Sequence, residues 1–341
     1  NTSAYALMSI TEIFLQHKLH TWQTVRMATG SGASRDDLMF EAAYLYYMEG
    51  LTQQAIGTKL GYTRWTIGRL IDEARETGLV SITINHPRAQ THHLERQITA
   101  ELGVQAIVVP GNNTDGVAAA ARAAAKYLVN RSPRTLGISW GRTMSAIAAA
   151  LNENWANGVV VYQTNGGPTH AGNNEVSSSV SAIAHTGNGT AYTLPAPALV
   201  GNPDLGPHLM AEPSVAHVLE GAHSANAIFY SPGTASTDSV LVKSGFLTSD
   251  SIDRIRDMGA VGDILSHFVD ADGEPIAAEL ERRTIALPLS QLASAKHKVA
   301  VAGEPAKAQA LVAAARAGLA DLIIIDTPTA ERVLAITSKE T

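Results

Sequence analysis

Apolar residues recur every three to four positions in three successive segments between residues 36 and 76. This helical spacing predicts one helix over Asp36–Glu49, a second over Gln53–Leu60 and a third that Thr63 caps and that runs to about Glu76. Thr52 stands in the same way before the second helix, where a threonine oxygen can accept hydrogen bonds from free backbone N–H groups. We therefore predict an all-α N-terminal unit of three short helices.

The pattern changes to alternation after Gly78. Residues Leu79–Asn85 alternate between apolar and polar side chains, which is typical of a strand. His86–Arg88 interrupts this pattern with a proline and indicates a boundary, and a helix is expected over His92–Leu102. We predict a poorly ordered leader over residues 1–35, an N-terminal domain over 36–88, a linker helix over 89–102 and a second domain over 103–341.

Beyond residue 103, alanine-rich helices alternate with short apolar strands. Such alternation makes consecutive strands parallel through right-handed crossovers, and helices then cover both faces of the sheet. We therefore predict that the larger domain is a Rossmann-like α/β domain with a mostly parallel sheet. The strands are expected at Ala106–Val109, Leu136–Ser139, Gly158–Gln163, Thr190–Leu194, Ala227–Tyr230, Ala260–Ile264, Lys298–Ala302 and Asp321–Ile325.

The composition fits a folded chain of two domains, with 341 residues of which 45% are apolar and 16% charged. The chain holds no cysteine, which excludes disulfides and thiol nucleophiles and fits a cytoplasmic protein. No apolar run reaches the roughly 18 residues of a membrane span, so we expect no membrane association. The 12 histidines show no metal-ligand spacing, and we expect neither a metal nor another cofactor.

The segment from Gln53 to Leu70 carries the pattern of two helices that meet at a tight turn. Such a turn needs a small residue where the helices approach and a residue that tolerates positive φ, and Gly57 and Gly61 supply these. This pattern, with Leu79–Asn85 as the wing, predicts a winged helix-turn-helix that binds double-stranded operator DNA. The net charge of −6 excludes a generally basic coat but not a local basic face, and an inert three-helix scaffold is the alternative. The expected DNA contacts are Thr52, Gln53, Tyr62, Thr63, Arg64, Trp65, Thr66 and Arg69.

Glycine and polar residues follow several of the predicted strands in the second domain. Gly141, Arg142 and Thr143 stand where a strand turns into a helix, and the first N–H groups of a helix can bind an anion. Ligands bind at the carboxyl ends of strands in open α/β sheets, and asparagine, aspartate and lysine at three further strand ends suit the hydroxyl groups of a polyol. The expected effector-binding residues are Ser139, Gly141, Arg142, Thr143, Asn165, Gly166, Asp263, Gly303 and Lys307.

The order of these motifs resembles that of the SorC family of sugar-responsive transcriptional regulators. The resemblance rests on YYMEGLTQQAI over Tyr46–Ile56 and RWTIGRL over Arg64–Leu70, followed in order by GISWGRT, NGG, VGD and AGEPAK. It covers about residues 36–341 and implies a winged helix-turn-helix followed by a domain similar to sugar-phosphate isomerases and deaminases. It also implies a sugar, polyol or phosphosugar effector and, in most members, a homotetramer built as a dimer of dimers.

The chain departs from the family pattern at three positions. Gly57 and Gly68 stand where the family usually has alanine and serine, and Glu304 stands where it usually has a glycine. A carboxylate beside Lys307 would repel a phosphate, which favours a non-phosphorylated polyol. We expect effector binding to change how subunits pack and hence the spacing of paired reading helices, whose half-sites lie about 34 Å apart on DNA.

Two other functions are compatible with parts of this pattern. An isomerase or deaminase could use Asp263 as a base and Lys307 as a Schiff-base amine, but a catalytic domain has no need of a DNA reader. An architectural DNA-binding protein would have no need of polar residues at the strand ends. We therefore expect a regulator without catalytic activity.

Overall fold

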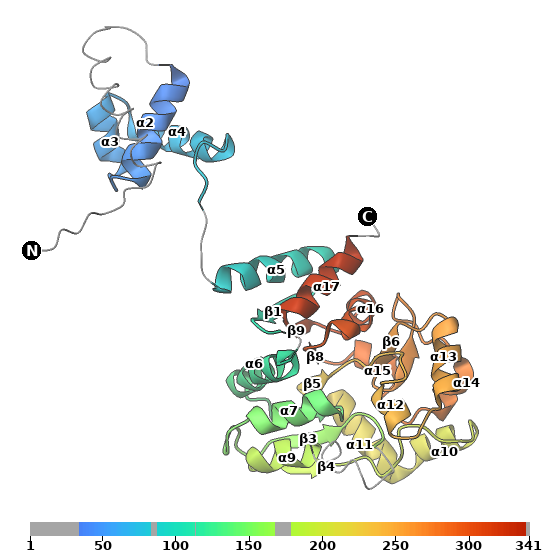
Figure 1. Cartoon of the computed structure of the whole chain (residues 1–341). Helices are drawn as coiled ribbons and strands as arrows, with labels where there is room; N and C mark the ends of the chain where they lie inside the picture. The colour runs from blue at the N-terminus through green and yellow to red at the C-terminus, as the bar shows by residue number, and fades with distance from the viewer. Residues whose placement is uncertain (1–33, 83–86, 113, 168–178, 339–341) are drawn as a thin grey trace, which may run out of the picture. The chain divides into compact units, whose positions relative to one another are not determined.

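Figure 1 shows the computed structural model of the chain, which describes residues 34–82, 87–112, 114–167 and 179–338. They belong to two compact units, Asn1–Ile84 and Asn85–Thr341. Almost all of the predicted leader lies outside the described residues, and Arg35 already belongs to the first described helix.

The described part of the first unit is three helices, α2 (Arg35–Tyr47), α3 (Gln53–Leu60) and α4 (Arg64–Glu76). The turn between α3 and α4 holds Gly61 in the left-handed region at φ 79°, a conformation that glycine adopts without strain. Each helix begins at a hydroxyl cap, and removing such a cap typically destabilises a helix by about 1 kcal/mol. The side chains that the three helices bury against one another are Met39, Ala42, Ala43, Leu45, Ile56, Ile67, Leu70, Ile71 and Ala74.

The strand predicted over Leu79–Asn85 is wrong in its described part, because residues 79–82 form no strand. Gly78 takes φ 77°, and the backbone N–H of Val80 donates to the carbonyl of Ala74 at 2.8 Å. The chain thus folds back on the end of α4, and no described segment of this unit offers a partner strand. Residues 83–85, the rest of the predicted wing, lie outside the described residues.

Helix α5 (Pro87–Leu102) begins earlier than predicted and packs within the second unit. Leu94 and Ile98 are buried in the core of that unit. Glu95 accepts a hydrogen bond of 2.9 Å from the backbone N–H of Val108 on the neighbouring strand. The helix that the sequence predicts as a linker therefore contributes to the packing of the larger domain.

The second unit is built on a parallel sheet of seven strands in the order β1-β9-β8-β5-β2-β3-β4, which confirms the predicted α/β class. Every neighbouring pair is parallel, with registers such as Leu136 opposite Ala227 and Ile323 opposite Ala300. The strands are β1 (Gln105–Val109), β2 (Thr135–Ile138), β3 (Val160–Gln163), β4 (Thr190–Tyr192), β5 (Ala227–Tyr230), β8 (Lys298–Ala302) and β9 (Leu322–Asp326).

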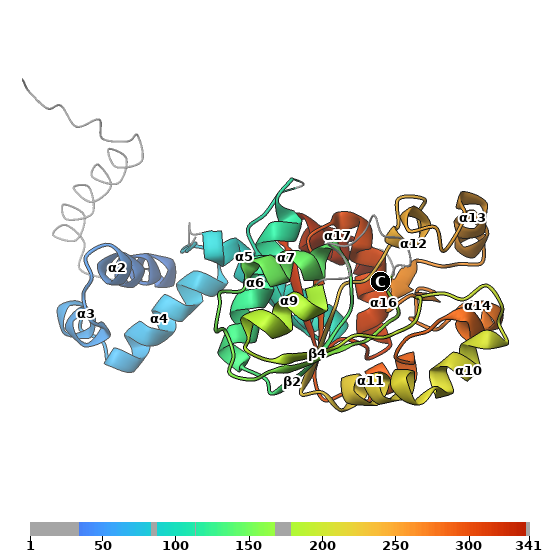
Figure 2. The same ribbon diagram turned by 90° about the horizontal axis from the view of Figure 1, so that it is seen from below.

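Helices cover both faces of this sheet, as the near-continuous apolar strands require. Successive residues of β9 point to opposite faces, so that Leu322 and Ile324 join one core and Ile323 and Ile325 the other. Figure 2 shows α7 and α9 on one face and α11 on the other. The first core lies under α6 (Gly116–Arg131), α7 (Arg142–Ala150) and α9 (Ser179–Thr186), and the second under α5, α11 (Pro213–Ser224), α16 (Ala308–Arg316) and α17 (Thr327–Thr337).

The segment Ala260–Ile264 was predicted as a strand of the main sheet, and this assignment is wrong. Strand β6 (Gly262–Ile264) pairs antiparallel with β7 (His267–Val269) in a separate two-stranded sheet. Leu265 and Ser266 between them have φ of 52° and 73°, the tight two-residue turn that sends a strand back along itself. Leu-Ser lacks the Asn-Gly signal of such turns, and for that reason the sequence did not reveal the hairpin.

A small lobe surrounds this hairpin and packs beside the carboxyl ends of the parallel strands. Its own apolar core includes Trp140, Leu241, Ile252 and Phe268. The further helices of the unit are α10 (Leu205–Ala211), α12 (Val240–Lys243), α13 (Ser249–Asp257), α14 (Ala278–Arg283), α15 (Leu289–Ala293) and the 3₁₀ turn η2 (Pro305–Lys307). Among the described residues, no helix is long and apolar enough to cross a membrane.

Candidate functional site

A pocket of about 390 Å³ opens at the carboxyl ends of four adjacent strands, β8, β5, β2 and β3. The helix after β2 covers one face of the sheet and the helix after β8 covers the other. The pocket therefore lies where the winding of the sheet reverses, the place at which open α/β sheets bind ligands. Its volume is within the range of small-molecule sites, and the lobe around β6 and β7 closes one side.

The loop after β2 brings a helix N-terminus to the pocket wall. Gly141 adopts φ 139°, which a side chain would strain, and Arg142 and Thr143 open α7. The hydroxyl of Thr143 accepts a hydrogen bond of 3.1 Å from Ser231, the residue after β5. Two neighbouring strand ends are thereby joined through their side chains.

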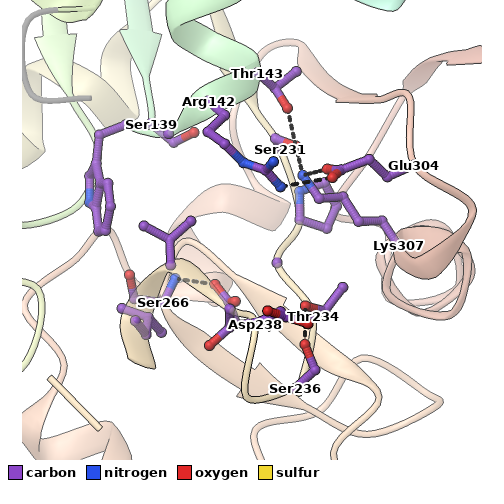
Figure 3. Close-up of a pocket in the computed structure, with 18 of the residues that line it drawn as sticks. Ser139, Arg142, Thr143, Ser231, Thr234, Ser236, Asp238, Ser266, Glu304 and Lys307 are labelled. Carbon is purple, nitrogen blue, oxygen red and sulfur yellow. Dashed lines mark hydrogen bonds and ion pairs between the residues drawn. The ribbon is translucent and has the colours of Figure 1, made fainter. Parts of the chain in front are cut away.

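Glu304, the residue before η2, forms ion pairs with both cationic side chains of this wall. Its Oε1 lies 2.7 Å from Arg142 Nη2 and its Oε2 lies 2.9 Å from Lys307 Nζ, and Figure 3 shows both side chains directed at this carboxylate. Lys307 also donates to Ser231 at 3.0 Å. Burial alone would raise the pKa of Glu304, but the charges and hydrogen bonds of Lys307 and Arg142 outweigh it and hold that pKa below its ordinary value.

Asp263 supplies a second carboxylate from strand β6. Its Oδ2 accepts the backbone N–H of Ser266 at 3.1 Å, and Ser266 Oγ accepts from Asn165 Nδ2 at 3.0 Å. Burial raises the pKa of Asp263 to about 6, although the Ser266 hydrogen bond and the charge of Lys307 oppose the shift. A Cβ on Gly233 would overlap the Asp263 carboxylate, so glycine is needed there.

Two buried polar atoms of the pocket wall have no hydrogen-bond partner among the described residues. They are Ser139 Oγ and Trp140 Nε1, both on the loop after β2. An unpaired buried donor or acceptor destabilises a protein by about 1–3 kcal/mol. Both atoms are enclosed by protein and are not part of the accessible surface of the pocket.

Seven of the nine predicted effector-binding residues line this pocket: Ser139, Gly141, Arg142, Thr143, Asn165, Asp263 and Lys307. The other two are not part of its lining, because Gly166 packs on the backbone of Pro197 and Gly303 on that of Gly116. The loop after β5 also lines the pocket and was not predicted from the sequence, although this loop follows a predicted strand. Its lining residues are Ser231, Pro232, Gly233, Thr234 and Ser236, and the lobe adds Asp238, Lys243 and Ser266.

The outer face of α4 in the first unit is the second candidate surface. Trp65 is 72% exposed and Tyr62 45% exposed, unusual values for large aromatic side chains. The guanidinium of Arg69 lies 5.0 Å from the Trp65 ring centre. Arg64 and Arg69 form no ion pair with another described residue, whereas Arg75 at the far end of α4 is paired with Asp72.

The remaining predicted DNA contacts also have local structural roles. Thr52 and Thr63 cap α3 and α4 by accepting from Ala55 and Thr66, and the Thr63 and Thr66 hydroxyls lie 2.8 Å apart. The side chain of Gln53 lies against Gly68, where a Cβ would come within 3.4 Å of its Oε1.

The two unusual glycines of this unit have different surroundings. At Gly57 a Cβ would come within 2.6 Å of the carbonyl oxygen of Tyr62, so the close approach of α3 to the turn requires glycine there. Gly68 faces only the end of a flexible side chain.

Comparison with known proteins places these two surfaces in context. A family model described as "Putative sugar-binding domain" matches residues 86–335. The regulator LsrR of Klebsiella pneumoniae is 30% identical over 321 residues, which cover 91% of this chain and 96% of LsrR. The crystal structure of the full-length sorbitol operon regulator SorC from Klebsiella pneumoniae covers 88% of this chain and 99% of that one, with a TM-score of 0.67 and 24% identity. The chain belongs to the SorC family of sugar-binding transcriptional regulators.

Membership of the SorC family confirms the resemblance carried by the sequence motifs. A further relative, the deoxyribonucleoside regulator of Bacillus subtilis, is 27% identical over 307 residues that cover 88% of this chain and 98% of the relative. The family match spans α5 as well as the α/β sheet and its lobe. These relatives bear the names of regulators and not of enzymes.

Proposed function

We propose that this protein binds operator DNA through α4 and releases or engages it in response to a carbohydrate-class effector held in the pocket at the strand ends. The convergence of seven predicted residues on one pocket, at the point where the sheet reverses its winding, carries this proposal. The pocket wall holds both donor and acceptor side chains, such as Ser231, Asn165 and Asp263, which suits a molecule with several hydroxyl groups. The regulator names of the relatives support the DNA half of the proposal.

The geometry of α3 and α4 supports a helix-turn-helix. The two helices meet at a glycine turn, which exposes Tyr62, and α4 presents Arg64, Trp65 and Arg69 on its exposed N-terminal half. In a helix-turn-helix the N-terminal residues of the second helix contact base edges in the major groove. The two arginines can bond guanine or phosphate, and the Trp65 ring offers an apolar contact for a thymine methyl group.

Selection of bound fragments from a genomic DNA library, followed by fluorescence anisotropy, tests this assignment. Arg69→Ala and Arg64→Ala should each weaken operator binding by about tenfold or more, since a good base contact contributes about 1–3 kcal/mol. Arg75→Ala is the matched control, because Arg75 lies on the same helix and is paired with Asp72. Equal effects of the three substitutions would exclude α4 as the reading helix.

Coupling between effector and DNA is the second part of the proposal. A panel of sugars, polyols and their phosphates should contain a compound that changes operator affinity at least fivefold, and Asn165→Ala should abolish this response without changing the affinity of the effector-free protein. Asn165 is chosen because its side chain bridges the strand β3 end to Ser266 of the lobe. If no compound that binds the protein alters operator affinity, effector control is refuted.

We further propose that the regulator works in the cytoplasm as a homotetramer. In this assembly, subunit packing sets the distance between paired α4 helices. We also propose that the pocket binds its ligand without converting it. Dimeric readers need half-sites about 34 Å apart, so an effector that alters subunit packing changes this spacing. Sedimentation equilibrium with and without operator DNA tests the assembly. Product analysis of the sugar panel tests turnover, and conversion that Asp263→Ala abolishes would contradict the proposal.

A further inference from the structure

The charges that line the pocket are balanced. The described lining includes three basic side chains, Arg142, Lys243 and Lys307, and three acidic ones, Asp238, Asp263 and Glu304. Each basic group is already engaged by a carboxylate. Glu304 pairs with Arg142 and with Lys307, and Asp238 lies 3.2 Å from Lys243.

The ion pair between Glu304 and Lys307 lies in a partly buried environment. The side chain of Lys307 is 12% exposed and that of Glu304 28%, so water screens this ion pair less than a pair at the surface. Both carboxylate oxygens of Glu304 are used, one for each cation. Glu304 thus engages the two cationic side chains, Arg142 and Lys307, that an incoming anion would otherwise bind.

A phosphate group carries a charge of about −1.5 to −2 at neutral pH. To bind Arg142 and Lys307 it would have to displace Glu304 and leave that carboxylate unpaired close by. Asp263 adds a further negative group on the β6 side of the pocket. The phosphate and the two carboxylates would carry like charges in a partly buried site, where repulsion is stronger than in water. The described wall therefore disfavours a phosphorylated ligand.

An uncharged polyol meets no such opposition. Asp263 offers acceptor capacity beyond the one bond from Ser266, and the hydroxyl-bearing residues Thr234 and Ser236 line the same pocket. Hydroxyl groups both donate and accept, so one polyol can satisfy acceptors and donors together. The spare acceptor capacity of Asp263 among these hydroxyl-bearing residues therefore suits a neutral ligand with several hydroxyls.

We propose that Glu304 is a specificity-determining residue that acts as a built-in substitute for phosphate, so that the pocket selects an uncharged polyhydroxylated ligand over its phosphate ester. The proposal rests on the proposed function of the pocket and narrows its ligand class. It assigns Glu304 two tasks, which are to hold Arg142 and Lys307 in place and to exclude anions.

The first test uses inorganic phosphate alone as the probe, with isothermal titration and thermal shift of the full chain. Wild type should bind phosphate at least about tenfold more weakly than Glu304→Gln, because the substitution removes one charge next to two cations. Asp238→Asn is the matched control. It removes the same charge from the same pocket, where Asp238 is paired with Lys243, and should change phosphate affinity less than about threefold. Equal phosphate affinity of wild type and Glu304→Gln overturns the proposal, whatever the sugar panel shows.

The second test uses matched pairs of four- and five-carbon polyols and their monophosphates. The wild type should bind the neutral member of the best pair at least tenfold more tightly than its phosphate, and Glu304→Gln should reduce or reverse this ratio. Tighter binding of the phosphate member by the wild type overturns the inference. Tighter binding of the phosphate member would leave effector control of DNA binding intact. Conversely, if no bound compound alters operator affinity, the proposed function is refuted but the role of Glu304 in ligand selection is not.

Discussion

Replacing Asp263 by asparagine should stabilise the protein while abolishing effector binding. The pKa of this carboxyl is raised from its ordinary 3.8 to about 6, mainly by burial. The folded state therefore holds its proton more tightly than the unfolded state. Asparagine keeps the shape and can still accept the Ser266 N–H, but it carries no charge to bury.

The sign of the pH dependence follows from linkage. Well below the ordinary pKa of 3.8 the group is protonated in both states and contributes nothing to the difference. As the pH rises from about 4 to 6 the unfolded state releases the proton first, so the free energy of unfolding of the wild type falls. Above pH 6 the penalty is complete, and a raised pKa of this size corresponds to about 3 kcal/mol at most. Because the pocket is open to water, we expect a gain of about 1–3 kcal/mol for Asp263→Asn.

Urea unfolding at pH 4, 5, 6 and 7.5 measures this difference. The advantage of Asp263→Asn should be smallest at pH 4, grow through pH 5 and 6, and level off by pH 7.5. Glu153→Gln removes an exposed carboxylate that forms no ion pair with another described residue and serves as the control, whose small effect should not follow this profile. A pH-independent difference between Asp263→Asn and the wild type would refute the reasoning that burial of charge destabilises this site.

Two further predictions concern glycines. Gly57→Ala should lower the stability of the first unit by about 1–3 kcal/mol, because its Cβ would meet the Tyr62 carbonyl at 2.6 Å. Gly68→Ala should leave that stability unchanged or raise it by up to about 1 kcal/mol, because only the Gln53 side chain must move, and the opposite order in thermal unfolding would contradict this packing. Gly233→Ala should weaken effector binding by tenfold or more in titration calorimetry, because its Cβ would displace the Asp263 carboxylate, and unchanged affinity would exclude Asp263 from the binding surface.

The sequence predicts features that neighbouring residues set among themselves. The bounds Gln53–Leu60 for α3, Ala227–Tyr230 for β5 and Lys298–Ala302 for β8 agree with the structure, because caps, turn glycines and apolar periodicity act over a few residues. The parallel sheet was also predicted, because a chain that alternates strands and helices connects successive strands by crossovers that make them parallel.

Features that depend on a distant partner were not available from local patterns. Leu79–Ile82 alternates like a strand but has no described strand to pair with, and Gly262–Ile264 pairs with the unforeseen His267–Val269. Ser231 was missed because only the strand order places the end of β5 between those of β2 and β8.

Glu304 shows most clearly which features follow from the sequence and which depend on the tertiary structure. The sequence by itself determined that a carboxylate stands three residues before Lys307, where it would oppose a phosphate. Only the tertiary structure decided that Arg142, 162 positions earlier in the chain, meets the same carboxylate. The reason is that the crossovers of the sheet bring the end of β2 near that of β8, and no pattern local to either segment contains that information.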